Sequence, residues 1–262
     1  MFEFAWYHGR RRIKGAGALT VGLGLMTALY VYMFPTITSE VNLDEYVEAW
    51  PPALREAFGV ESLSTIEGFL ATELYAFGWV ILLGLYVAYS AASLVADDVE
   101  HGRMDMTLSL PVTRSRVLLE KFASMLVPVF LVNLAMPVIV YVGVFAIDES
   151  ISVADLVMVH ALSIPYLLAA AAVGLLASVA FDRASIAQRA AMGVVFGLFL
   201  VDSVTSGTDF AWLGALSPTR YYDPAAILVR SSWDLQGAGI LLGATVVLVL
   251  ASRELFRRKD IQ

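Results

Sequence analysis

The sequence predicts an all-α membrane protein with six transmembrane helices and both termini in the cytoplasm. Hydrophobic residues make up 59% of its 262 residues, only 16% are charged, and the mean hydropathy is +0.74. Soluble domains carry about 25% charged residues. Six apolar stretches reach or approach the roughly 20 residues that a membrane-spanning helix needs. Because none alternates as a barrel strand does, we expect helices to satisfy the backbone hydrogen bonds in lipid.

The first expected element is an interfacial helix over residues 1–14. Four aromatic residues, Phe2, Phe4, Trp6 and Tyr7, precede four basic residues there. This pattern suits a helix in the headgroup region of the inner leaflet, with its bases against anionic lipids. The apolar run that follows ends in no cleavage-like site, so we interpret it as a retained first span.

The six expected spans follow in order along the chain. Their ranges are 15–35, 69–96, 122–147, 155–181, 184–204 and 235–252. The last two are shorter and richer in Gly and Ser than the first four. Between the first two spans, residues 40–67 form an acidic loop that is either a short, broken amphipathic helix at the outer interface or an ordinary solvated loop. Between the last two, aromatic residues and prolines predict a segment that re-enters or lies along the membrane edge.

The distribution of basic residues gives the orientation. With six spans, 14 of the 17 Lys and Arg residues lie on the side of the termini and 3 lie on the opposite side. Cytoplasmic loops carry the excess of such residues. We therefore predict a multi-pass protein of the plasma membrane with cytoplasmic termini.

Motifs of a self-contained enzyme are missing from the sequence. A phosphate-binding loop needs Gly before Lys, but Lys14, Lys121 and Lys259 follow Ile, Glu and Arg. The three histidines are far apart, no serine lies in a G-x-S-x-G elbow, and there is no cysteine. We expect no cofactor or metal in this chain and no catalytic residue.

Ionisable residues inside the spans would indicate an ion relay. Glu73 and Asp202 lie near the outer ends of their spans, and no carboxylate lies at mid-depth, which argues against a proton-coupled carrier. Glu73 is a candidate either for contact with a substrate or for a structural or interfacial role. We expect Asn133 and His160 to be packed, hydrogen-bonded polar groups.

Two G-x-x-x-G patterns occur in the last two spans, at Gly193/Gly197 and Gly239/Gly243. Small residues let helices approach closely in lipid. These faces serve either contacts within the chain, which we expect, or a homodimer.

One compact polar segment, residues 97–116, interrupts the apolar sequence. Gly102 should break the helix that leaves the membrane, and Pro111 should stop the short helix that follows. Within "RMDMTLSL", Met104 pairs with Leu108 at i, i+4 spacing, as does Met106 with Leu110. A short helix with Met and Leu on its faces suits docking into the groove of a partner. The alternative is a solvated loop with a few apolar residues against the bilayer.

The stretch "ADDVEHGRMDMTLSLPVTRSRVLLEKF" resembles the signature of ABC-2-type transporter permeases: an acid-x-Gly segment, a short amphipathic run, an "LS-P-V-[ST]-R" turn and a downstream Lys-Phe. The matching positions are Glu100, Gly102, Leu108, Ser109, Pro111, Thr113, Arg114, Lys121 and Phe122. Arg103 departs from the pattern, which commonly has Thr there. The resemblance extends to "TELYAF", "LSPTRYYDPA" and "FRRKDI". Its subgroup is similar to permeases for nitrous-oxide-reductase maturation and for bacitracin or drug export.

The resemblance implies a permease that works with a separate ABC ATP-binding subunit, which holds ATP and Mg²⁺, and with a second copy of the permease or a paralogue. Residues 97–116, which we name the coupling segment, would transmit movement from the ATPase, and no nucleic acid is involved. The implied coupling residues are Glu100, Gly102, Arg103, Asp105, Met106, Leu108, Leu110, Pro111 and Arg114. The competing readings are a membrane scaffold or assembly factor without transport, and a six-helix secondary transporter.

Overall fold

The computed structural model describes residues 3–40, 43–49, 55, 63–109 and 111–259. Over these residues the protein is helical and contains no strand. Six helical spans are long and apolar enough to cross a membrane, as the sequence predicted. Their bounds are Arg12–Glu40, Ile66–Glu100, Arg114–Ala146, Val153–Ala180, Ala184–Thr205 and Leu235–Arg258.

Four spans are single helices and two are interrupted. The single ones are α1 (Glu3–Glu40), α10 (Val153–Ala180), α11 (Ala184–Thr205) and α13 (Leu235–Arg258). Residues 3–14, where an interfacial helix was predicted, are continuous with α1, and residues 1–2 lie outside the described part. The helices are longer than the predicted apolar spans, because charged residues at their ends, such as Arg257 in α13, are also helical.

The second span is built from four consecutive pieces. They are α4 (Ile66–Leu70), the π-helix η1 (Ala71–Leu83), α5 (Gly84–Ala92) and, after a turn, α6 (Ala96–Glu100). The third span consists of α8 (Arg114–Ala123) and α9 (Leu126–Ala146). Pro128 lies in the first turn of α9, where a helix does not use the backbone N–H that proline lacks.

Short elements complete the chain at the two ends of the bundle. They are α2 (Leu43–Glu48), α7 (Arg103–Leu108), the 3₁₀ helices η2 (Ala211–Leu216) and η3 (Pro218–Tyr221), and α12 (Pro224–Leu228). An amphipathic helix was one of the two predictions for the outer loop, residues 40–67. The structure describes α2 in this loop, whereas Pro51 and Pro52 lie outside the described residues. The segment before α13 turns back into the bundle, where Tyr222 and most of α12 are buried.

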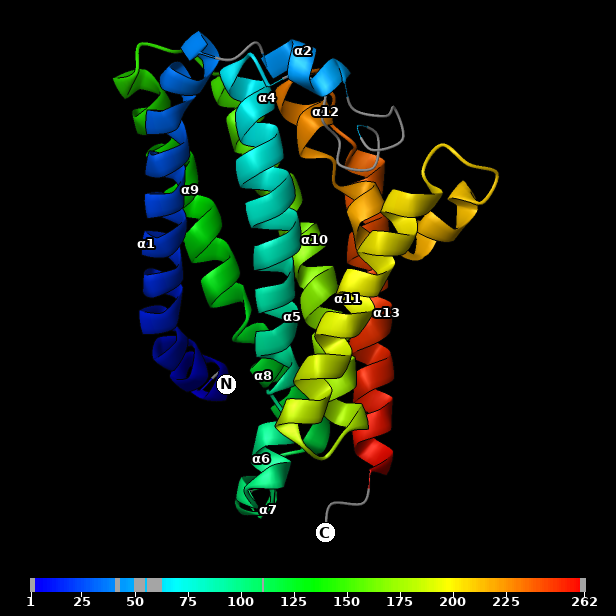
Figure 1. The fold of residues 1–262 in the computed structure, drawn as a ribbon. Coiled ribbons are helices and arrows are strands. Elements are labelled where there is room, and N and C mark those ends of the chain that lie inside the picture. The colour runs from blue at the N-terminus through cyan, green and yellow to red at the C-terminus, as the bar shows by residue number, and fades with distance from the viewer. Residues whose placement is uncertain (1–2, 41–42, 50–54, 56–62, 110, 260–262) are drawn as a thin grey trace.

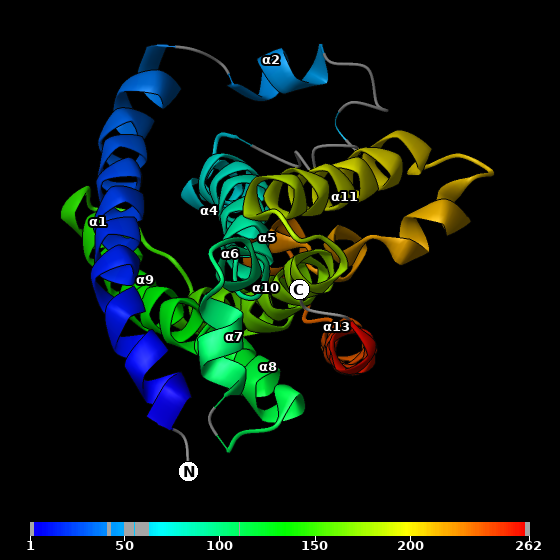
Figure 2. The same ribbon diagram turned by 90° about the horizontal axis from the view of Figure 1, so that it is seen from below.

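The second span and α10 form the centre of the bundle, and the other spans surround them (Figure 2). α10 packs against α5, α9, α11 and α13, while α1 packs mainly on α9. Small residues bring the central helices together. A Cβ at Gly174 of α10 would clash with the carbonyl oxygen of Ala88 in α5, so these two backbones touch. Buried alanines, among them Ala92, Ala170 and Ala187, continue this contact toward α11.

The G-x-x-x-G patterns do not serve this internal packing. At Gly193, Gly197, Gly239 and Gly243, no atom from another part of the described chain lies within 4 Å of the position that a Cβ would occupy. The expectation of internal contacts was therefore wrong at these four positions. The close internal contact falls instead on Gly174, which belongs to neither pattern.

Both termini lie toward the same end of the bundle as α6 and α7 (Figure 1). We name this the coupling end. The opposite end, which we name the cavity end, holds α2 and α12.

Candidate functional site

The coupling segment forms a turn that projects from the end of the second span. α6 ends at Glu100, Gly102 adopts a φ of +64°, and α7 starts at Arg103. A positive φ of this kind is readily adopted by glycine and rarely by residues with a Cβ. The predicted interruption at Gly102 is confirmed, and after it α7 lies across the tip of the coupling end (Figures 1 and 2).

The two faces of α7 have opposite exposure. Met104 is fully buried in the main core, and Leu108 is partly buried against it. Met106 has 66% of its surface exposed, and its neighbour Asp105 is also exposed. One face thus attaches α7 to the bundle and leaves an apolar side chain pointing outward. Of the other predicted coupling residues, Pro111 is exposed and Leu110 lies outside the described residues.

Ion pairs fix α7 to the end of the second span. Arg103 pairs with Asp97 and, with its Nε 2.9 Å from Oδ1, with Asp98. The hydrogen bond to Asp98 is the main cause that raises the pKa of Arg103 above its ordinary value. Asp98 also accepts from Lys121, whose side chain is buried. Arg103, the position that departs from the family pattern, therefore has a structural role here.

Glu100 connects the coupling segment to the fifth span. Its Oε2 accepts a hydrogen bond from the backbone nitrogen of Ala184 at 2.8 Å, and Ala184 is the first residue of α11. The first N–H groups of a helix have no partner within it, and a negative charge at that end is stabilising. Glu100 therefore ties α6 to the start of α11.

Arg114 contacts the last turn of α13. Its Nη1 donates to the carbonyl oxygens of Lys259 and, at 3.3 Å, of Phe256, and its guanidinium lies 5.9 Å from the centre of the Phe256 ring. Lys259 in turn donates to the carbonyl of Val179 at 2.8 Å. A basic side chain that bonds the last carbonyls stabilises a helix end. This arrangement holds α8, α10 and α13 together at the coupling end.

Ser178 stabilises the break in the second span, and sequence reasoning missed it. Its fully buried Oγ accepts from the backbone nitrogens of Val95 at 2.8 Å and Ala96 at 3.0 Å. The break between α5 and α6 leaves these donors without helical partners. No signal in the sequence pairs a serine of the fourth span with them.

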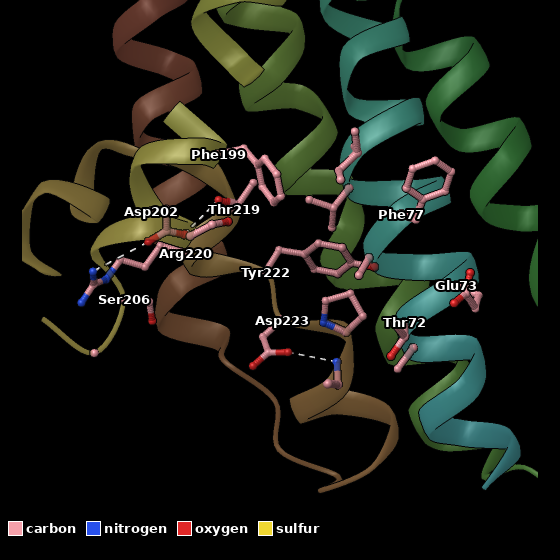
Figure 3. A pocket seen from close by; sticks show the side chains of 18 of the residues that line it. Thr72, Glu73, Phe77, Phe199, Asp202, Ser206, Thr219, Arg220, Tyr222 and Asp223 are labelled. Atoms are coloured by element: carbon pink, nitrogen blue, oxygen red, sulfur yellow. Dashed lines mark hydrogen bonds and ion pairs between the residues drawn. The ribbon is translucent and has the colours of Figure 1, made fainter. Parts of the chain in front are cut away.

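A cavity of about 680 Å³ lies between η1 and α11 in the half of the bundle toward the cavity end (Figure 3). One wall comes from the π-helix and the other from the last turns of α11 and the chain after it. The wall residues that matter below are Glu73, Phe77, Phe199, Asp202, Tyr222 and Asp223. The structure thus places Glu73, the candidate for substrate contact, on the wall of a cavity.

A buried hydrogen-bonded cluster supports this cavity from the centre of the bundle. Burial raises the pKa of Tyr222 well above its ordinary value, and its protonated hydroxyl donates to the carbonyl of Val159 at 3.0 Å. The ring of Tyr222 stacks on Tyr166 at 5.6 Å. Nearby, His160 Nδ1 lies 2.8 Å from the Leu156 carbonyl, which can only accept. Its Nε2 is therefore left to accept from Tyr75 at 3.4 Å.

Asn133 takes part in the same cluster. Its Oδ1 accepts from Ser163 Oγ at 2.6 Å, and Ser163 also accepts from the indole N–H of Trp79 at 3.1 Å. Asn133 and His160 are thus packed, hydrogen-bonded groups, as the sequence predicted.

The comparison with family models decides the identity of the chain. The model described as ABC-2 family transporter protein matches residues 19–261, which is nearly the whole chain. The chain belongs to this family. An ABC-2 permease is the transmembrane subunit of an ABC transporter and works with a separate ATP-binding subunit, so the predicted family and permease role are confirmed. The subgroup of this ABC-2 permease stays a prediction. The search of curated proteins found no match to the chain.

Proposed function

We propose that this ABC-2 permease is the membrane half of an ATP-driven exporter of the plasma membrane. Its coupling end, with both termini, would face the cytoplasm, and its cavity would lie toward the outside. The excess of Lys and Arg on the side of the termini, 14 against 3, supports this orientation. The partner ATPase would bind ATP and Mg²⁺.

The observation that carries the proposal is the exposure of Met106 on a fixed element. Met104 and the ion pairs of Arg103 hold α7 in place, whereas Met106 points outward with 66% of its surface exposed. An apolar side chain on a short helix that is held rigidly suits a hydrophobic groove in a partner. We propose that α7, with Asp105 and Pro111 beside it, seats in such a groove of the ATPase.

Movement would reach the cavity through α11. Glu100 bonds the first residue of this helix, and Phe199 and Asp202 near its other end line the cavity. α11 has 22 residues and is therefore about 33 Å long. Because a helix moves as a stiff body, a displacement of the coupling segment would shift the wall of the cavity. Closure of the ATPase dimer would thus change access to the cavity.

A second copy of the permease would pack on the outward face of α11. This span is the least buried of the six. Gly193 and Gly197 leave open space on it, and Phe196, Leu200 and Val204 are exposed beside them. Small residues that allow close approach, flanked by apolar side chains, suit a contact between helices in lipid.

The composition of the native complex tests the proposal. We expect the tagged chain, purified from its host in mild detergent, to give a particle with two 28.4 kDa permease chains and two ATP-binding subunits by native mass spectrometry. A particle without an ATP-binding subunit in every mild condition would favour a scaffold without transport. A particle with one permease chain would refute the second copy.

Chemical labelling tests the orientation separately. The chain has no cysteine, so single cysteines at Met106→Cys and Leu216→Cys are the only sites for a maleimide. Both side chains are exposed, one at each end. In intact cells, an impermeant maleimide should label Leu216→Cys and spare Met106→Cys, which should react only after the membrane is opened and the ATPase is removed. The reverse pattern would invert the topology.

A further inference from the structure

The cavity has the size of a small-molecule site and is surrounded by apolar and aromatic residues. Its volume of about 680 Å³ falls within the roughly 300–1,000 Å³ of ligand pockets. Figure 3 shows the rings of Phe199 and Phe77 on its two walls, with Tyr222 between them. Ala76, Val80 and Ile81 add apolar surface from η1. The body of a ligand held here should therefore be apolar.

The charged groups around the cavity are mostly acidic. Three carboxylates line it, those of Glu73, Asp202 and Asp223, against one guanidinium, that of Arg220. Arg220 is already engaged, because it donates to the carbonyl of Ala211 and lies 3.9 Å from Asp202. An anionic ligand would place its charge among carboxylates, whereas a cationic ligand would meet attraction.

Two of the three carboxylates are occupied by their own surroundings. Asp202 accepts from Thr219 at 2.9 Å. Asp223 accepts from the backbone nitrogens of Ala225 and Ala226 and so caps α12. Glu73, which is half-buried, has no hydrogen bond or ion pair with any residue of the described chain. A carboxylate in this position can pair with the charge of a ligand without breaking an existing contact.

We propose that this cavity binds lipophilic organic cations and that Glu73 pairs with their charge. The aromatic walls strengthen this preference, because the faces of aromatic rings attract cations. The polar groups on the cavity wall are the three carboxylates, a few hydroxyls and the already engaged Arg220, so a cation with a large apolar body fits better than a sugar or an anion. This proposal rests on the proposed function in one respect, since it takes the cavity to be the substrate site.

A pair of ions with the same shape and opposite charge provides the test. Tetraphenylphosphonium and tetraphenylborate both carry four phenyl groups. We would measure saturable binding of each radiolabelled ion to the full chain in lipid nanodiscs. Wild-type protein should bind the cation saturably and the anion only at the level of empty nanodiscs. Glu73→Gln should weaken cation binding by about tenfold or more, which corresponds to the loss of one charge interaction.

Two further variants make the test decisive. Glu149→Gln makes the same change at an exposed acid outside the cavity and should bind the cation as the wild type does. Glu73→Lys should bind the anion instead. Equal binding of the two ions, or cation binding that is unchanged in Glu73→Gln, would overturn the proposal. The assay needs neither ATP nor the ATPase, so its failure is distinguishable from a failure of the proposed complex.

Discussion

At the scale of single residues, the coupling segment is divided between groups that hold it and groups that remain exposed. Arg103 and Arg114 were predicted as coupling residues, and both make contacts within the chain. The sequence could place them in the segment but could not reveal their partners, since Phe256 lies 142 positions from Arg114. Met106, in contrast, is exposed. The sequence alone could not distinguish it from Met104, which lies on the buried face of the same helix.

We predict that the buried hydroxyl of Ser178 contributes to the stability of the protein. Ser178→Ala leaves the buried nitrogens of Val95 and Ala96 without an acceptor, which costs about 1–3 kcal/mol for each unsatisfied group. We expect a clearly lower melting temperature in detergent. Ser252→Ala is the matched control, because this equally buried serine only donates to a carbonyl of its own helix. Equal losses in the two variants would contradict the role of Ser178.

At the scale of elements, hydropathy located the six spans but not the irregularities inside them. The second span was predicted as one helix over 69–96, yet it contains the π-helix η1 and a break before α6. Apolar composition does not distinguish a π-helix from an α-helix. π-helices are rare and often occur at functional sites, and η1 supplies one wall of the cavity.

The close contact between α5 and α10 gives the element-scale prediction. Gly174→Ala would push a Cβ into the backbone carbonyl of Ala88, which side-chain rotation cannot relieve. We expect a loss of about 1–3 kcal/mol, as for other overpacked cores. Gly243→Ala introduces the same methyl group into open space on α13, and its stability should stay within about 1 kcal/mol of the wild type. Thermal unfolding compares the two, and a neutral Gly174→Ala would refute the contact.

At the scale of the whole molecule, the coupling segment and the cavity lie toward opposite ends of one helical bundle. Local sequence was sufficient to propose the coupling segment, because its residues are consecutive and its motif resembles that of the family. The cavity could not be predicted in the same way, since residues 71–81 and 199–225 meet only in the folded chain. The sequence could therefore name Glu73 as a candidate for contact with a substrate, but it could not show the cavity that Glu73 lines.

We propose above that α7 docks into the ATPase through Met106. The most direct measurement is the amount of ATP-binding subunit that co-purifies with Met106→Asp, per permease chain, compared with the wild type. Leu216→Asp is the control, because it places the same charge at a side chain exposed at the cavity end. We expect the ATPase to be lost from Met106→Asp and retained by Leu216→Asp. Wild-type amounts of ATPase on a folded Met106→Asp permease would contradict it.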